Sequence, residues 1–509
     1  MVLSLLGLAL AAPALPVDAV ARHDALLAAF DAHFAPGAHA PETGTPVHAG
    51  CLTGLVASLK QDWDLFSPAE RARMTRTLAP WKADLVEVPA SPPPPPSATE
   101  SCFGTQKANA LAGERFVVEY DDGISESNVQ RLLTALEFSY DKEVTELGWR
   151  APMGAGNCLL PVYIEPSNQQ SAYTTVDRCA TGYCPYIVAY SGSFADLSWA
   201  DTMAAHEFNH ALQYSYGVAN EFWWWEATAT YVEESVYPTS NWWAYYVTGY
   251  AENPHLSLNA SDQQDQDIFW HMYGMAIWAF YLDEYQGGLD TVQGAWEAAR
   301  RAGGRNEAYY YGAWDALEDL GIDFDAAYLD FAVRNATMDY EAHRILPAVK
   351  TVGRVRALPA SDTVAGGARP QGYGQNYIPV DGGLGAGILR LTVTGDEAVA
   401  WGGAIVATAD GRALRAAVTS AEAGTPLVVE LPDYAGEELM LMVTPLARNE
   451  RPRSYDWSLE IVPPPVEEVE DDKGMFGCSA VPGAAGTVPV LVGVGLALVG
   501  RRSRRRPLA

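Results

Sequence analysis

The five residues His206-Glu-Phe-Asn-His210 restrict the fold and chemistry of this chain more than any other segment. The two histidines are four positions apart, so on a helix both imidazoles point to the same side, one turn apart. In that arrangement two neutral imidazole nitrogens can bind one Zn²⁺ ion. Glu207 then lies where its carboxylate reaches a water on the metal rather than the metal itself. The pattern predicts a helix with a zinc site in which Glu207 is the general base.

The residues around this pattern are typical of a helix. Residues 198–214 contain an apolar stripe at helical spacing, and Gly217 is suited to end a helix. Ser198, with Asp201 three positions later, resembles a capping box with Asp in place of the usual Glu or Gln. We therefore expect one helix that begins near Ser198 and carries both histidines.

Two histidines and a water leave one position of a tetrahedral zinc ion for a third protein ligand. A histidine six residues after His210 would give the metzincin pattern, but Tyr216 stands there and Gln213 replaces the metzincin glycine. A glutamate of the next helix is the alternative. Glu226 follows an aromatic run, opens an alanine-rich helix and is favoured. The rival acidic residues are Glu221, Glu233 and Glu234.

The two segments together resemble a known group of enzymes. His-Glu-x-x-His followed by Glu226-Ala-Thr-Ala-Thr-Tyr231 resembles the gluzincin metallopeptidases, and is most similar to secreted metallopeptidases of myxobacteria. The resemblance implies that His206, His210 and Glu226 bind one Zn²⁺ ion per chain and that Glu207 is the base. It also implies an α+β zincin-like catalytic domain, with a small sheet in the upper lobe and a helical lower lobe, that acts on a peptide or protein substrate.

Further site residues are less constrained by the sequence. Glu233 is two turns after Glu226 on the same helix face, where it can orient a zinc-binding histidine or simply face solvent. Gluzincin sites commonly contain a Tyr or His that stabilises the oxyanion. Tyr231, His271 and Tyr273 are the candidates here. The last two lie in the apolar stretch 268–282, which is expected to form one buried helix, and aromatic residues there are also typical of core packing.

The charge of the chain argues against a nucleic-acid partner. The formal net charge is −30, so the protein would repel phosphate groups. Such acidity is typical of a protein that stays soluble outside the cell. The acidic stretch Asp262–Asp267 is a candidate for structural Ca²⁺, but it lacks EF-hand spacing. Oligomeric state is not encoded in any motif.

Both ends of the chain contain features of export. Residues 1–21 resemble a signal peptide with a short apolar region, although a basic start is missing. Residues 463–509 form an acidic tether, then Cys478, an uncharged stretch over 479–500 and an arginine cluster. This order resembles the myxobacterial C-terminal sorting tag, which implies processing near Cys478 and a place on the cell surface or release. A plain membrane anchor is the alternative.

The cysteines agree with an oxidising compartment. Of the six, Cys179 and Cys184 can close a small loop, and Cys51 with Cys102 can tie the N-terminal segment to the domain that follows. No Cys-x-x-Cys pair suggests a separate zinc site.

Changes in pattern divide the chain into segments. Residues 22–100 are expected to be helical and end in the Pro-rich linker 91–97, and they are either a propeptide or a permanent accessory segment. Residues 101–345 form the predicted zinc metallopeptidase domain, with strands near 114–120, 159–165 and 186–190 and mostly helices after the zinc-binding helix. Residues 346–462 contain short alternating runs and predict a β-sandwich.

We therefore expect an exported zinc-dependent endopeptidase, on the cell surface or secreted. The alternative is a non-catalytic surface binding protein with a degenerate metalloprotease fold. The intact Glu207 argues against that alternative, because loss of the base is the simplest route to degeneracy. An aminopeptidase would need an acidic residue for the substrate amine, and no motif supplies one.

Overall fold

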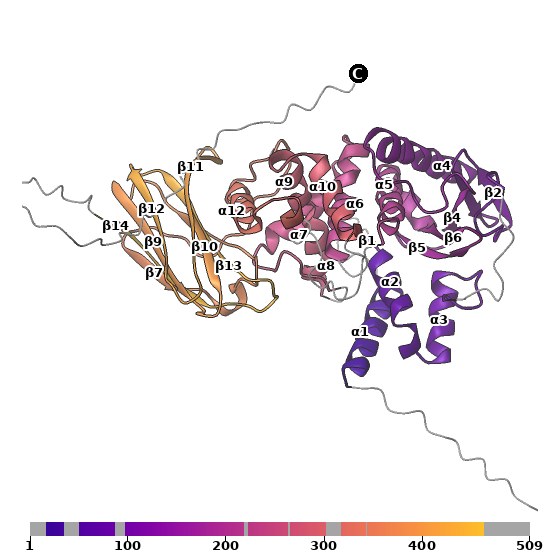
Figure 1. Cartoon of the computed structure of the whole chain (residues 1–509), viewed down its shortest axis with the longest axis horizontal. Coiled ribbons are helices and arrows are strands. Elements are labelled where there is room, and N and C mark those ends of the chain that lie inside the picture. The colour runs from indigo at the N-terminus through magenta and orange to yellow at the C-terminus, as the bar shows by residue number, and fades with distance from the viewer. Residues whose placement is uncertain are drawn as a thin grey trace, which may run out of the picture. The chain divides into compact units, whose positions relative to one another are not determined.

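The structure is a computed structural model that describes residues 17–34, 50–86, 97–217, 222–262, 265–301, 317–342 and 344–462. Helices and strands both form large parts of it, so the chain has the expected α+β composition (Figure 1). It divides into two compact units. The first comprises Met1–Trp242, Ser261–Phe269 and Arg300–Asn306, and the second comprises Trp243–Ala260, Trp270–Ala299 and Glu307–Ala509.

Several predicted segments fall outside the described residues. These are residues 1–16 of the expected signal peptide, residues 91–96 of the linker and the whole C-terminal segment 463–509. Among the described residues, no helix is both long enough and apolar enough to cross a membrane.

In the described residues of the first unit, six strands form one sheet. They are β1 (Gly50–Cys51), β2 (Asn109–Ala112), β3 (Phe116–Tyr120), β4 (Leu160–Glu165), β5 (Ser171–Cys179) and β6 (Gly182–Tyr190). Their order is β1-β5-β6-β4-β3-β2. Strands β3, β4 and β6 are parallel, β5 forms an antiparallel hairpin with β6, and β1 pairs parallel with β5.

Three helices of the first unit matter most for the site: α4 (Glu126–Tyr140), α5 (Leu197–Tyr214) and α6 (Phe222–Val236). Helix α5 contacts the sheet through Phe208, whose ring lies 5.4 Å from that of Phe116 on β3. The same ring lies 5.5 Å from Tyr140 at the end of α4. Helix α5 is thus enclosed on several sides, which explains why nearly all its side chains are buried.

The start of α5 differs from the prediction. Asp196, not Ser198, caps the helix, because its Oδ1 accepts hydrogen bonds from the backbone N–H groups of Ser198 and Trp199, at 2.9 and 3.2 Å. Asp201 takes no part in a capping box. Its carboxylate instead accepts two hydrogen bonds from Arg131 of α4, at 2.6 and 2.8 Å.

The N-terminal segment is helical where it is described, as expected. It contains α1 (Val17–Phe34), α2 (Thr53–Gln61), a 3₁₀ turn (Trp63–Leu65) and α3 (Pro68–Leu78). The buried residues of these helices share one hydrophobic core with side chains of the sheet, among them Tyr173, Tyr186 and Tyr190. The segment therefore belongs to the fold of the first unit rather than standing apart from it.

One predicted disulfide is confirmed and one is wrong. Cys179 and Cys184 close the β5–β6 hairpin, as expected. Cys102 does not pair with Cys51 but with Cys158, and the Cα atoms of this pair lie 5.0 Å apart. The reason is the strand order. Cys102 and Cys158 flank the parallel bridge between Ser101 and Leu159, which leads into β4, whereas Cys51 lies on β1 at the other edge of the sheet.

The described part of the second unit combines helices with two four-stranded antiparallel sheets. Apart from one or two residues at their ends, its helices are α7 (Trp242–Glu252), α9 (Ala276–Tyr285), α10 (Leu289–Arg301) and α12 (Phe324–Asn335). Helix α8 (Gln266–Gly274) is divided, and only its part from Trp270 on belongs to the second unit. Helix α12 contacts one of the strands directly, because the hydroxyl of Tyr377 on β8 (Asn376–Val380) donates to the carbonyl of Ala332 on α12 at 2.9 Å.

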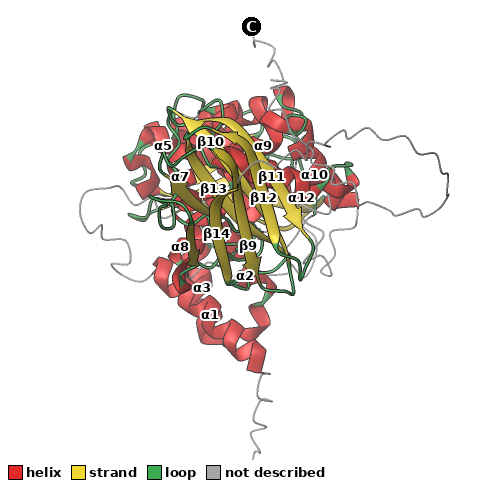
Figure 2. Cartoon of the chain, turned by 90° about the vertical axis from the view of Figure 1, so that its left-hand side faces the viewer, coloured by secondary structure: helices red, strands yellow, loops and turns green. Residues whose placement is uncertain are grey.

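The two sheets of the second unit, whose strands are yellow in Figure 2, share one hydrophobic core. One has the order β11-β10-β13-β8 and the other β12-β9-β14-β7. The strands are β7 (Ala360–Thr363), β8 (Asn376–Val380), β9 (Gly387–Gly395), β10 (Ala400–Ala409), β11 (Arg412–Ala421), β12 (Leu427–Tyr434), β13 (Glu438–Leu446) and β14 (Tyr455–Val462).

The stretch 268–282, which the sequence suggests is one helix, forms two. Helix α8 ends at Gly274 and α9 begins at Ala276. Gly274 lies so close to α7 that a Cβ atom there would be 2.3 Å from the backbone nitrogen of Tyr250. The close approach of the two backbones explains why glycine stands at the break.

Candidate metal centre

Helices α5 and α6 bring together the three predicted metal ligands, which come from the two sequence segments 206–210 and 226–231. His206 and His210 lie on α5, and Glu226 lies on α6, just after its first turn. All three side chains are buried. Ala227 and Ala229, the small residues that follow Glu226 on α6, are also fully buried.

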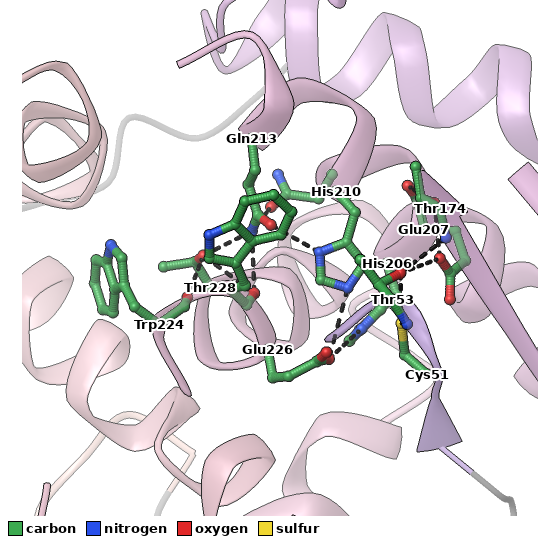
Figure 3. Close-up of polar contacts among 12 residues, drawn as sticks. Cys51, Thr53, Thr174, His206, Glu207, His210, Gln213, Trp224, Glu226 and Thr228 are labelled. Atoms are coloured by element: carbon green, nitrogen blue, oxygen red, sulfur yellow. Dashed lines mark hydrogen bonds and ion pairs between the residues drawn. The ribbon is translucent and has the colours of Figure 1, made fainter. Parts of the chain in front are cut away.

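Glu226 is the residue that joins the two imidazoles (Figure 3). Its Oε2 atom lies 3.1 Å from Nε2 of His206 and 3.6 Å from Nε2 of His210. A fourth donor, Sγ of Cys51, belongs to the same group, and the four ligand atoms all lie within 4.8 Å of one another. The sequence did not predict Cys51 as part of this group.

The donor distances fit a small tetrahedral cation. Ligand atoms about 2.0–2.2 Å from such an ion lie about 3.3–3.6 Å apart, close to the separations that Glu226 makes with the two histidines. His210 gives a second indication. Its side chain is 0% exposed, and among the described residues nothing forms a hydrogen bond with its Nε2 atom. A buried polar atom of this kind is costly unless an ion satisfies it.

The protonation of the cluster also favours a positive charge between these residues. Burial alone would lower the pKa of His206, but its hydrogen bonds to Glu226 and Glu233 outweigh burial and raise this pKa to about 10. Burial acts in the opposite direction on Glu226, yet the charge of His210 and the hydrogen bond from His206 lower its pKa to about 2. A divalent cation would supply this positive charge in place of the proton.

Glu233 orients the first histidine. Its Oε1 atom lies 2.8 Å from Nδ1 of His206, so Nδ1 carries a proton and donates it to the carboxylate. The other ring nitrogen, Nε2, is then the one that faces Glu226. A carboxylate behind a metal-binding imidazole fixes its tautomer and makes it a stronger ligand. The structure thus places Glu233 in the orienting position that the sequence left open.

Gln213 does the same for the second histidine. Its Oε1 atom accepts a hydrogen bond from Nδ1 of His210 at 2.7 Å. The amide cannot be flipped, because its Nε2 atom donates to the carbonyl of Trp225 at 3.0 Å, and to Oδ1 of Asn209 and Oγ1 of Thr228. In the neutral form of His210 the proton is then on Nδ1, and Nε2 turns its lone pair toward the cluster. The residue that breaks the metzincin pattern thus has a defined role in this fold.

Glu207, the expected base, lies beside the cluster on the side of the sheet. Its Oε2 atom accepts hydrogen bonds from Oγ1 of Thr174 on β5 at 2.8 Å and from Oγ1 of Thr53 on α2 at 3.3 Å (Figure 3). Thr174 also donates to the backbone carbonyl of Glu207 at 2.8 Å. Two hydroxyl groups thus hold the carboxylate of Glu207 next to the metal-ligand candidates. Hydroxyl groups are uncharged, so these hydrogen bonds do not neutralise the carboxylate.

The other candidates are placed differently. Glu234 is half-buried and lies outside the donor group, and Glu221 is outside the described residues. Tyr231 is buried on α6 in the first unit. His271 and Tyr273 belong to the core of the second unit, with their rings 6.0 Å from Tyr250 and 5.4 Å from Tyr246 respectively. An oxyanion role for these three residues stays a prediction.

The calcium hypothesis also stays a prediction. The acidic stretch Asp262–Asp267 is only partly described. Within it, Asp265 caps α8, because its Oδ1 atom accepts hydrogen bonds from the backbone N–H groups of Asp267 and Ile268, at 2.9 and 3.1 Å.

Comparison with known proteins gives a family but no activity. The family described as "Family of unknown function (DUF6055)" matches residues 118–402. No curated protein matches the chain. One matching solved structure is that of a β-glucosidase from Paenibacillus barengoltzii, at 13% identity over 31% of this chain and 18% of that chain, with a TM-score of 0.12. The match spans under a fifth of that enzyme and carries no argument about fold or function.

The Gln213 network gives a test that needs no metal. Replacing Gln213 with Leu strands the partners of its amide: Nδ1 of His210, the carbonyl of Trp225 and the polar atoms of Asn209 and Thr228. Each stranded buried group costs about 1–3 kcal/mol, so we expect the free energy of unfolding of the first unit to fall by at least that amount. Denaturant unfolding measures it.

The matched control is Gln130→Leu, which changes the same side chain on the exposed face of α4. Its effect should stay within about 0.5 kcal/mol. Equal stabilities for the two variants would contradict the assigned network.

Proposed function

The chain belongs to the family of unknown function DUF6055, and we propose that this member is an exported zinc-dependent endopeptidase of the gluzincin type. The first unit would be a zincin-like catalytic unit, and the paired sheets of the second unit a β-sandwich. The proposal rests on one observation: Glu226 lies within 3.1 and 3.6 Å of two imidazole nitrogens, one of which has no hydrogen-bond partner among the described residues.

The donor set decides between metals. Two imidazoles and one carboxylate are the ligands typical of catalytic zinc, which keeps one position for water or substrate. Calcium and magnesium prefer oxygen ligands throughout and more of them. A bound zinc ion would supply Lewis acidity and make water a nucleophile near neutral pH.

The protein residues have distinct roles in this scheme. His206, His210 and Glu226 would hold the ion, while Glu233 and Gln213 fix the two imidazoles with their Nε2 atoms toward it. Glu207 would accept the proton of the attacking water and pass it to the leaving amine. The hydroxyls of Thr174 and Thr53 hold its Oε2 atom in place, which leaves its other oxygen for this proton.

Substrate and location follow from the surroundings of the site. In the sheet beside α5, the outer side of β5 pairs only with the two-residue strand β1. An extended peptide could pair with β5 by β-augmentation in place of β1, so we expect a peptide in extended form as substrate. The two disulfides of the described residues are compatible with an oxidising compartment. Together with the sequence features of residues 1–21 and 463–509, they favour a protein that is exported to the cell surface or secreted.

Metal content tests the ligand set. The purified full chain should contain about one zinc ion, and Glu226→Ala should lose it on dialysis, because the carboxylate that joins the two imidazoles is then missing and the remaining donors bind zinc more weakly. Elemental analysis after dialysis measures this. Glu234→Gln, two turns later on the same helix, is the matched control and should keep the metal. A folded protein without zinc would contradict the proposal, and so would a Glu226→Ala variant that retains it.

The role of Glu207 is tested by separating metal binding from turnover. Glu207→Gln should keep its zinc but cleave casein about 10²–10⁴-fold more slowly, the usual range for loss of a general base. Glu126→Gln, at the exposed start of α4, serves as control. Chelator-sensitive cleavage that survives in Glu207→Gln would show that another residue is the base. If neither the wild type nor any variant cleaves peptides, including a variant in which Cys51 of the ligand group is replaced by Ala, the non-catalytic alternative is favoured.

A further inference from the structure

Strand β1 brings a residue from the N-terminal segment to the metal centre. It pairs parallel with β5, with Gly50 opposite Ser171 and Cys51 opposite Ala172. The backbone N–H of Leu52 donates to the carbonyl of Ala172 at 2.8 Å and extends this pairing. β1 therefore occupies the sheet edge next to α5, and it does so at the level of the site.

The side chain of Cys51 points into the ligand group rather than into the apolar core (Figure 3). Its Sγ atom lies within 4.8 Å of the donor atoms of His206, His210 and Glu226. The residue is buried and lies outside both disulfides of the described residues. The Nε2 atom of His210, buried and without a hydrogen bond among the described residues, belongs to the same group and independently indicates that an ion belongs there.

The same segment also contacts the expected base. Oγ1 of Thr53 donates to Oε2 of Glu207 at 3.3 Å and accepts a hydrogen bond from the backbone N–H of Thr174 at 2.8 Å. The thiol of Cys51 in turn donates to Oγ1 of Thr53 at 3.0 Å. Within four residues, the segment reaches the ligands, the base and the sheet edge where an extended peptide would pair.

We propose that Cys51 is the fourth ligand of the metal and that residues 50–53 hold the centre closed. The thiol loses its proton to solvent, and the sulfur takes the position that His206, His210 and Glu226 leave open. No position then remains for water or a substrate carbonyl, and β1 covers the edge that would bind the peptide. The inference rests on the proposed zinc site, and it makes residues 50–53 an inhibitor contained in the chain.

The contacts of the N-terminal segment with the sheet support this inference, because they would keep residues 50–53 at the metal centre until the segment dissociates. Its helices share a hydrophobic core with the sheet, and Nζ of Lys60 on α2 forms an ion pair with Asp177 of β5 at 2.7 Å. Lys82 contacts the same carboxylate. No disulfide of the described residues joins residues 50–86 to the rest of the chain. Release therefore requires no bond to be reduced, only the loss of these packing and ionic contacts.

Cobalt substitution of the full chain tests the ligand directly. A thiolate bound to Co²⁺ gives an intense near-ultraviolet charge-transfer band, which imidazole and carboxylate ligands do not give. We expect this band in the wild type with about one cobalt ion per chain, and its loss in Cys51→Ser, with affinity for cobalt lowered at least about 10-fold. Thr53→Val, which removes the neighbouring hydroxyl but keeps the sulfur, should retain the band.

The outcomes separate this inference from the proposed function. If wild type binds one cobalt ion without the band, or if the band persists in Cys51→Ser, Cys51 is not a ligand and the inference fails while the metal site stands. If no cobalt binds at all, the metal site itself fails.

A small chelating ligand tests whether the thiolate closes the centre. Acetohydroxamate should change the cobalt spectrum of Cys51→Ala at concentrations at least about 10-fold below those needed for the wild type, because the fourth position is then open to it. Equal titration curves for the two proteins would overturn the closed centre. This comparison does not depend on peptide cleavage.

Discussion

The contact of Glu226 with the imidazoles of His206 and His210 is the interaction on which the rest of the first unit's site depends. It joins α5 to α6 and places three ionisable side chains where almost no water reaches them. Burial of such groups is unfavourable unless each is paired or bound to an ion. The residues around the site meet this condition. Glu233 and Gln213 form hydrogen bonds with the Nδ1 atoms of the two histidines, and a cation would bind their Nε2 atoms.

The sequence predicted the parts of this arrangement that depend on local geometry. Two histidines four residues apart on a helix must share one face of it. The pattern of residues around Glu226 likewise predicted the second helix that carries this ligand. The loop from Cys179 to Cys184 is short enough to close on itself, and it does. The alternating runs after residue 346 also form strands, since period-two burial is a local property.

What the sequence could not predict depends on contacts between distant segments. Strand β5 was not predicted, although Thr174 and Asp177 on it bind Glu207 and Lys60 in the fold. β1 has only two residues and exists only because β5 offers an edge. The partner of Cys102 depends on the order of the strands, so the positions of the cysteines in the sequence led to the wrong partner, Cys51 instead of Cys158. Gln213 was noted only as a departure from a motif, and no local signal revealed that it holds His210.

The central claim is that α5, α6 and β1 together build one zinc site from His206, His210, Glu226 and Cys51. Anomalous diffraction from a crystal of the full chain, measured on both sides of the zinc absorption edge, tests it most directly. The account predicts one peak in the first unit, about 2.0–2.3 Å from the four donor atoms. A peak bound elsewhere, or well-ordered side chains of these four residues with no peak among them, would contradict it.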